Sequence, residues 1–183
     1  MVKPSFKGIF TGSFYKPFYF MAPELCSREA HDALGAKIFR YINPKVTFSA
    51  DQLRHNFGSA TINNWFWGGD RQYSGLRLHG EPHYSPTSDH SYGNALDMIF
   101  KTATAQEVRN HIEANPDLYP FITFVEEGYS VNWLHISVSN VASTFRPRNK
   151  TSIIFWNADT GGYREVPRSE DFSISSFNEG VAK

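Results

Sequence analysis

A stretch of ten residues in this chain has the residue types of a metal site. It reads Ser-Asp-His-Ser-Tyr-Gly-Asn-Ala-Leu-Asp and runs from Ser88 to Asp97. His90 lies in the polar first half, and Gly93 allows a sharp turn because glycine accepts positive φ. Asp97 follows in an apolar run, where a carboxylate is costly to bury without a cation or strong donors. We therefore expect His90 to fold back over a strand and to share a cation with Asp97.

A second segment supplies a third ligand. Residues 132–138 read Asn-Trp-Leu-His-Ile-Ser-Val. Leu134, Ile136 and Val138 occupy every second position, which is typical of a strand with one buried face. The alternation predicts that Trp133, His135 and Ser137 share the opposite face. Two histidines and one aspartate leave a fourth tetrahedral position open, which is typical of catalytic rather than structural zinc. Zinc in such a site lowers the pKa of water to about 7 and polarises carbonyl groups.

Both segments resemble the motifs of an enzyme family, the zinc D-Ala-D-Ala carboxypeptidases and L-Ala-D-Glu endopeptidases, whose fold is shared with the Hedgehog signalling domain. The family pattern Ser-x-His-x-x-Gly-x-Ala-x-Asp is matched here by Ser88, His90, Gly93, Ala95 and Asp97. The pattern Trp-x-His is matched by Trp133 and His135. Ser74-Gly75-Leu76-Arg77 is similar to the family's Ser-Gly-x-Arg. The resemblance covers about residues 50–140.

The resemblance implies Zn²⁺ at His90, Asp97 and His135. It also implies that the Arg77 guanidinium stabilises a tetrahedral oxyanion while amide bonds are hydrolysed in the stem peptides of bacterial peptidoglycan. Several branches of the family are phage lysins, so the implied protein is a phage lysin or a virion-associated cell-wall hydrolase with virion partners. Three further residues are expected to contact the stem peptide: Ser88, Tyr92 and Trp133.

The general base is the point where this chain departs from the family pattern. Many members carry an acidic residue three positions before the final histidine, but here that position holds Asn132, which cannot act as a base. A largely phage branch carries Glu-Phe-Gly or Glu-Tyr-Gly shortly before Trp-Val-His, and Glu126-Glu127-Gly128 is similar to it. We expect Glu126 to be the general base, with Glu127 as the second choice.

The position of Glu126 depends on the register of the predicted hairpin. If Glu126 pairs with Trp133, it lies diagonal to His135, with about 7–8 Å between the Cα atoms. A tighter turn would pair Glu126 with Val131 and move it too far from the ligands. The sequence leaves both registers open.

Two other functions remain open at this point. The missing acid at Asn132 favours a non-catalytic structural or virion protein that has kept a zinc site. A metal-independent phosphoesterase is suggested more weakly by His83-Tyr-Ser85 and His135-Ile-Ser137, which fit a pair of His-x-Ser/Thr motifs. That alternative gives no role to Asp97 or Gly93.

Charge and cysteine content exclude several classes. Eighteen basic residues balance eighteen acidic ones, which argues against nucleic acid or an anionic membrane as the partner. The single cysteine, Cys26, excludes an intrachain disulfide and a cysteine zinc site. No signal peptide and no membrane span are recognisable. We expect synthesis in the cytoplasm, followed by action on the cell wall after release or within a phage virion.

The pattern along the chain predicts an α+β domain in which helices flank an antiparallel sheet around the zinc site. We expect an irregular arm at 1–22, one domain at 23–170 and a mobile tail at 171–183. The expected helices are 23–42, 49–55 and 104–115. The expected strands are 76–78, 94–100, 121–126, 131–139, 152–156 and 162–166, of which the third and fourth form a hairpin, as do the last two.

Overall fold

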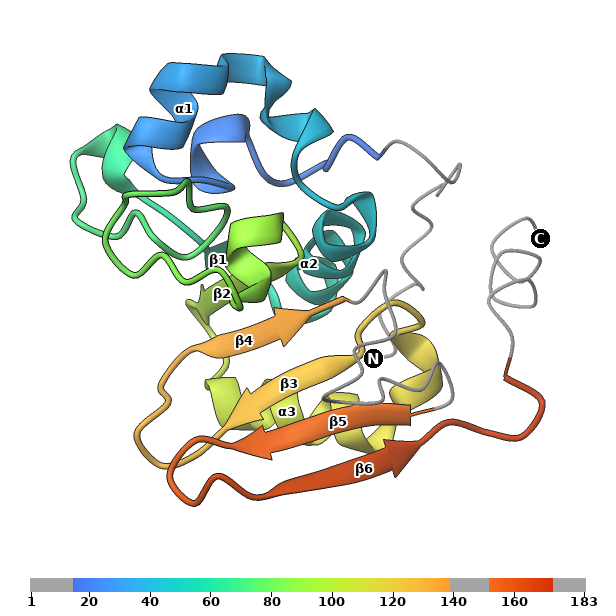
Figure 1. Cartoon of the computed structure of the whole chain (residues 1–183). Coiled ribbons are helices and arrows are strands. Elements are labelled where there is room, and N and C mark those ends of the chain that lie inside the picture. Colours follow the sequence, from blue (N-terminus) through green and yellow to red (C-terminus); the bar gives the residue numbers. More distant parts are fainter. Residues whose placement is uncertain (1–14, 139–151, 173–183) are drawn as a thin grey trace.

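A computed structural model describes residues 15–138 and 152–172, and its centre is one six-stranded sheet (Figure 1). The strand order is β1-β2-β4-β3-β5-β6. The strands are β1 (Ala60–Thr61), β2 (Ala95–Phe100), β3 (Phe124–Glu127), β4 (Leu134–Ser137), β5 (Ser152–Asn157) and β6 (Tyr163–Pro167). The α+β class is confirmed. The all-antiparallel expectation is wrong, because β3 and β5 pair in parallel.

The register of the sheet divides its residues between two faces. One transverse row contains Leu96, Ile136, Val125 and Phe155, all buried in the core. The neighbouring row on the opposite face contains Asp97, His135, Glu126 and Trp156. The sheet therefore separates an apolar core from the face that carries the predicted site.

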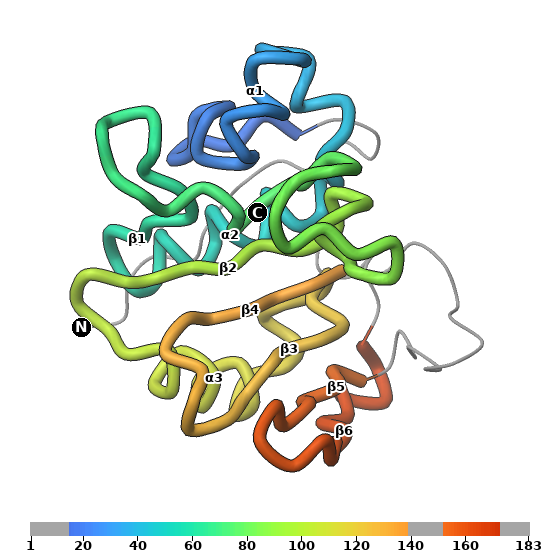
Figure 2. The backbone as a smooth tube through the Cα atoms, turned by 60° about the vertical axis from the view of Figure 1, so that its left-hand side comes forward, coloured from blue at the N-terminus to red at the C-terminus, as the bar shows by residue number. Residues whose placement is uncertain are grey.

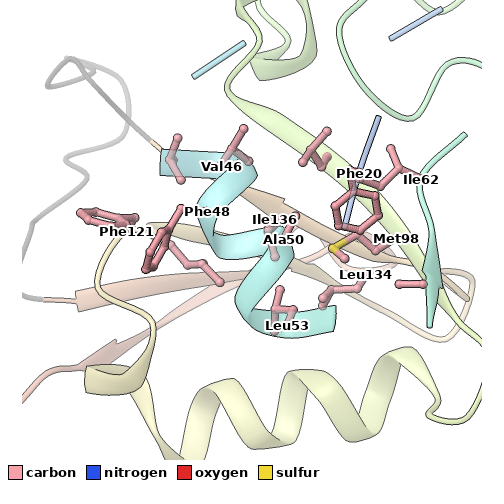
Figure 3. Packing of buried hydrophobic residues seen from close by; sticks show 14 of the residues in the cluster. Phe20, Val46, Phe48, Ala50, Leu53, Ile62, Met98, Phe121, Leu134 and Ile136 are labelled. Carbon is pink, nitrogen blue, oxygen red and sulfur yellow. The ribbon is translucent and has the colours of Figure 1, made fainter. Parts of the chain in front are cut away.

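Two helices cover the apolar face. Helix α2 (Pro44–Phe57) directs Val46, Ala50 and Leu53 toward Leu134 and Ile136 of the sheet (Figure 3). Helix α3 (Ala105–Ala114) lies behind the strands in Figure 1. The predicted capping box of α3 is confirmed, since Thr104 accepts from the Glu107 N–H and the Glu107 carboxylate accepts from the Thr104 N–H.

The N-terminal helices differ from the prediction. The helix expected at 23–42 is instead three short helices, η1 (Ala22–Glu24), α1 (Arg28–Leu34) and η2 (Gly35–Arg40). Gly35 ends α1 with φ of 51°, a left-handed value that interrupts the periodicity. The helix expected at 49–55 is wrong at its start: α2 begins at Pro44, capped by Asn43. Ser49 lies inside α2.

The remaining expectations concern the strand predicted at 76–78, the two ends of the chain and membrane-spanning helices. The strand expected at 76–78 is only an isolated bridge between Cys26 and Leu76. Within the expected arm, residues 15–22 lie against the body of the domain, with Tyr15 and Phe20 buried. Residues 1–14 and 173–183 lie outside the described residues. Across the described ranges, no helix combines the length and hydropathy needed to cross a bilayer.

A long connection between β1 and β2 completes the frame of the site. It holds two single-turn helices, η3 (Trp65–Trp67) and η4 (Asp89–Tyr92). Figure 2 shows this connection on the β2 side of the sheet, away from β5 and β6. It adds no strand to the sheet, but the Ser74 carbonyl accepts from the Asp97 N–H. The loop is thereby attached to β2 beside the predicted aspartate ligand.

Candidate metal centre

The three predicted ligands converge on one point of the open sheet face. Asp97 of β2 and His135 of β4 are direct cross-strand partners, so their side chains leave the sheet side by side. His90 approaches from η4. The distances are 2.7 Å from His135 Nδ1 to Asp97 Oδ1, 3.3 Å from His90 Nε2 to Asp97 Oδ1, and 3.3 Å from His90 Nε2 to His135 Nδ1.

This triangle can be compared with the geometry of a tetrahedral zinc ion. With ligand bonds of about 2.0–2.1 Å, two ligand atoms on a tetrahedron lie roughly 3.3 Å apart. The two edges that involve His90 already have this length, at 3.3 Å each. The third edge, 2.7 Å between His135 and Asp97, must open by roughly 0.6 Å. Among the described residues, this is the group of three or more His, Cys, Asp or Glu side chains close enough to hold one ion.

The position of His90 is fixed by the turn that the sequence predicts. Ser88 caps η4 by accepting from the His90 N–H, and Gly93 ends it with φ of 66°. A Cβ atom at Gly93 would lie 2.3 Å from the Tyr41 carbonyl oxygen, so a side chain there would have to displace backbone. Glycine at this position therefore allows η4 to pack closely enough to bring His90 over β2.

A backbone carbonyl selects the ring nitrogen that His90 presents. Nδ1 of His90 lies 3.0 Å from the Gly75 carbonyl oxygen, to which it donates. The proton on Nδ1 leaves Nε2 with its lone pair facing Asp97 and His135. Gly75 is itself confined, because a Cβ atom there would lie 2.1 Å from the Leu25 carbonyl oxygen. The loop 74–76 is therefore an outer support of the site.

The three groups shift one another's pKa values. Burial lowers the pKa of His90, and the nearby Asp97 carboxylate only partly offsets this effect. Burial alone would raise the pKa of Asp97, but His90 and His135 together hold it well below its ordinary range. Burial also acts to lower the pKa of His135, yet the hydrogen bond to Asp97 outweighs it and the pKa is raised. The cluster thus offers an ionised carboxylate, a neutral His90 and a proton held by His135.

Arg77 lies in the site, but its contacts are with the protein. Its Nη2 is 3.5 Å from Asp97 Oδ2, the carboxylate oxygen that does not contact the histidines. Its Nε donates to the Tyr73 carbonyl at 2.6 Å and its Nη1 to the His83 carbonyl at 3.0 Å. Arg77 therefore orients the Asp97 carboxylate and ties the loop 73–83 to it.

The two acidic candidates lie on opposite faces of the sheet. Glu126 is the direct partner of His135, so both registers considered for the hairpin were wrong and Glu126 is nearer than either predicted. Its carboxylate has no hydrogen bond or ion pair with any described side chain. Glu127 points to the helix side, where Arg164 Nη2 binds it at 2.9 Å. Glu127 therefore lies away from the three ligands, whereas Glu126 lies beside them.

The residues expected to contact substrate are spread around the centre. Ser88 serves as the cap of η4. Tyr92 is exposed, and its hydroxyl donates to the Pro86 carbonyl at 2.7 Å. Trp133 is half-buried just before β4. Of the weaker phosphoesterase pair, the His83 ring packs against Tyr73. Ser85 binds Thr87 rather than joining the ligand cluster.

Two supporting residues were missed by sequence reasoning. The Phe124 ring meets the His135 ring edge-on, with centroids 5.9 Å apart, and limits its rotation. Arg109 of α3 is buried and donates to the carbonyls of Glu126, Val131 and Trp133. The alternation of β3 could have indicated Phe124. No sequence signal distinguishes Arg109 from an exposed helix residue.

Comparisons with models of protein families, with curated proteins and with solved structures each found no match.

Proposed function

We propose that this chain is a zinc-dependent peptidase that hydrolyses amide bonds in the stem peptides of bacterial peptidoglycan. The convergence of His90 Nε2, Asp97 Oδ1 and His135 Nδ1 beside Glu126 carries the proposal. Two imidazoles and a carboxylate fit zinc, and three protein ligands leave a coordination position for substrate or solvent. The substrate class is supported by the motif resemblance between residues 74 and 135.

A zinc ion in the cluster would supply Lewis-acid activation of a carbonyl and of water at neutral pH. The protein's own groups account for the remaining steps. Glu126, across from His135 and without an ion-pair partner among the described residues, is placed to accept the proton of the attacking water. As the C–N bond breaks, the same carboxyl group returns this proton to the leaving amine. Arg77 keeps the Asp97 carboxylate oriented toward the histidines.

The test uses the full chain with equimolar zinc, and two glutamates that differ in the face they occupy. Release of amino groups from purified cell walls should require zinc and should stop with a chelator. Glu126→Gln should keep one zinc per chain and lose about 10²–10⁴-fold in rate, the usual contribution of a general base. Glu127→Gln, on the opposite face, should keep most of the activity.

Two outcomes would contradict the proposal in different ways. A protein that binds no zinc lacks the proposed centre. Zinc bound at one equivalent, with no amino groups released from any cell wall, would support the alternative of a structural or virion protein that retains the metal.

A further inference from the structure

A cavity of about 700 Å³ opens at one end of the sheet, apart from the three ligands. It lies between the first turn of α3 and the β3–β4 turn. Its volume is in the range of pockets that hold small organic ligands. None of the residues that line it is one of the three proposed metal ligands or the proposed base Glu126.

The lining of this cavity combines apolar and polar groups and carries no unpaired charge. Its two charged groups are already engaged: Arg109 by three main-chain carbonyls, and Glu127 by Arg164. The apolar part comes from Met98, Ile99, Phe100, Ala103 and Val131. A ligand with a formal charge would find no free partner here, whereas the polar groups of a neutral ligand can exchange their water contacts for hydrogen bonds to the lining.

Unused hydrogen-bonding groups stand at the same cavity. In the described part of the chain, the Asn132 amide, the Asn157 amide nitrogen and the Tyr129 hydroxyl have no hydrogen-bond partner, and all three residues line the cavity. Amides and a hydroxyl can both donate to and accept from the hydroxyl or acetamido groups of a ligand.

Tyr129 is held by its backbone while its side chain is left in solvent. Its N–H donates to Asp159 Oδ2 at 2.5 Å, and the neighbouring Ser130 hydroxyl donates to Asp159 Oδ1 at 2.5 Å. Gly128 has φ of 148°, and a Cβ atom there would lie 2.8 Å from Asp159 Oδ2. The ring itself is fully exposed, at 105%. An aromatic ring is thus presented at the cavity by a turn whose backbone is tied to the β5–β6 turn.

We propose that this cavity binds a neutral sugar ring, with Tyr129 stacking on its C–H face and Asn132 and Asn157 binding its polar substituents. A pyranose combines an apolar face with uncharged donors and acceptors, which matches a cavity that has all three. The match is one of charge, of hydrogen-bonding capacity and of aromatic contact.

The cavity is lined from the helix side by Arg109 and Glu127, and it reaches the face of the proposed metal centre at Ile99 of β2. Ile99 lines the cavity and Asp97 is two residues away on the same face, about 7 Å along the strand. The link between the two sites rests on the proposed function: one peptidoglycan substrate would place its glycan in the cavity and its peptide at the three ligands. Binding of the sugar by itself does not require that the protein be a peptidase.

The probe is a soluble tetramer of N-acetylglucosamine, added to the full chain and followed by changes in the NMR signals or by calorimetry. Tyr129→Ala should weaken binding at least tenfold, Tyr129→Phe should retain most of it, and Asn132→Ala should weaken it severalfold. Tyr163→Ala is the matched control, because Tyr163 is also highly exposed but does not line the cavity. Affinity should change little between 50 and 500 mM salt, since the ligand is neutral.

The result is kept separate from the metal chemistry by two further measurements. Binding should persist in EDTA and in His135→Ala, whether or not the protein hydrolyses amides. The sugar site is refuted if the wild-type protein does not bind the tetramer. It is also refuted if Tyr129→Ala and Asn132→Ala bind as well as Tyr163→Ala, or if affinity falls steeply with salt.

Discussion

Zinc should stabilise this protein against heat, and the ligand geometry allows the cost of the rearrangement to zinc affinity to be estimated. The ion must replace the 2.7 Å hydrogen bond between His135 and Asp97, a contact with a charged group worth about 1.5–3 kcal/mol. That cost weakens zinc binding by about one to two orders of magnitude relative to a cluster without the bond. The other two edges of the triangle, at 3.3 Å, need little change.

The expected effect on unfolding follows from mass action. Free zinc at 100 times its dissociation constant stabilises the folded state by about 2.7 kcal/mol. In a domain of this size each kcal/mol raises the Tm by about 2–4 °C, so zinc should raise it by about 5–11 °C. The assay is calorimetric or fluorescence-detected unfolding of protein freed of metal and then titrated with zinc.

Two histidine variants make the measurement specific. His135→Ala removes one corner of the triangle and should abolish the zinc-dependent increase in Tm. His79→Ala is the matched control, because His79 is exposed on the loop before η4 and is not one of the three ligands. An equal increase in both variants would show that zinc binds elsewhere, and the absence of any increase in the wild-type protein would refute the geometric argument.

Gly93→Ala should destabilise the fold by more than about 1 kcal/mol in denaturant titrations, because the residue has φ of 66° and its Cβ would meet the Tyr41 carbonyl; no loss would contradict the turn. Arg109→Leu should cost about 2–5 kcal/mol by the same measurement, since it removes the donor that Arg109 supplies to three carbonyls. Burial raises the pKa of Cys26 to about 12, so its alkylation at pH 8 should be about a thousandfold slower than that of the unfolded chain, as quantified by mass spectrometry. Because the raised pKa of His135 means that zinc must displace its proton, zinc affinity should fall as the pH is lowered through that pKa, and calorimetry in different buffers should detect proton release.

The ligand set could be predicted because each of its parts has a local signal. The alternation in 132–138 places His135 on the face opposite to Leu134 and Ile136, and the structure confirms it. Gly93 indicates the turn before β2, and its left-handed φ confirms that reading. Both inferences rest on sterics within a few residues, which a single sequence contains.

The partner of His135 on β3 could not be predicted in the same way. The register of a hairpin depends on the conformation of its connection, and here residues 128–133 form a longer link than either register assumed. That link is shaped by Asp159 and Arg109, which are distant in sequence. The same limit applies to the parallel pairing of β3 with β5, which is a long-range contact.

The start of α2 shows how two local helix-start signals compete. Ser49 with Gln52 matches a capping box, but the Ser49 hydroxyl donates to the Lys45 carbonyl within a helix that has already begun. Asn43 followed by Pro44 is equally a start signal, since Asn caps the helix and Pro occupies its first turn. Burial of the α2 face against the sheet decided between the two.

The proposed metal centre also makes the alignment of β4 in the sheet measurable through zinc binding. If the register of β4 shifted by one residue, the His135 side chain would point into the apolar core. Ile136 would then lie on the face that carries Asp97. Such a misaligned chain would have only His90 and Asp97 to offer, too few to hold an ion firmly. Zinc would therefore bind tightly only to the correctly aligned sheet. Zinc added during refolding would increase the fraction of molecules that have this alignment.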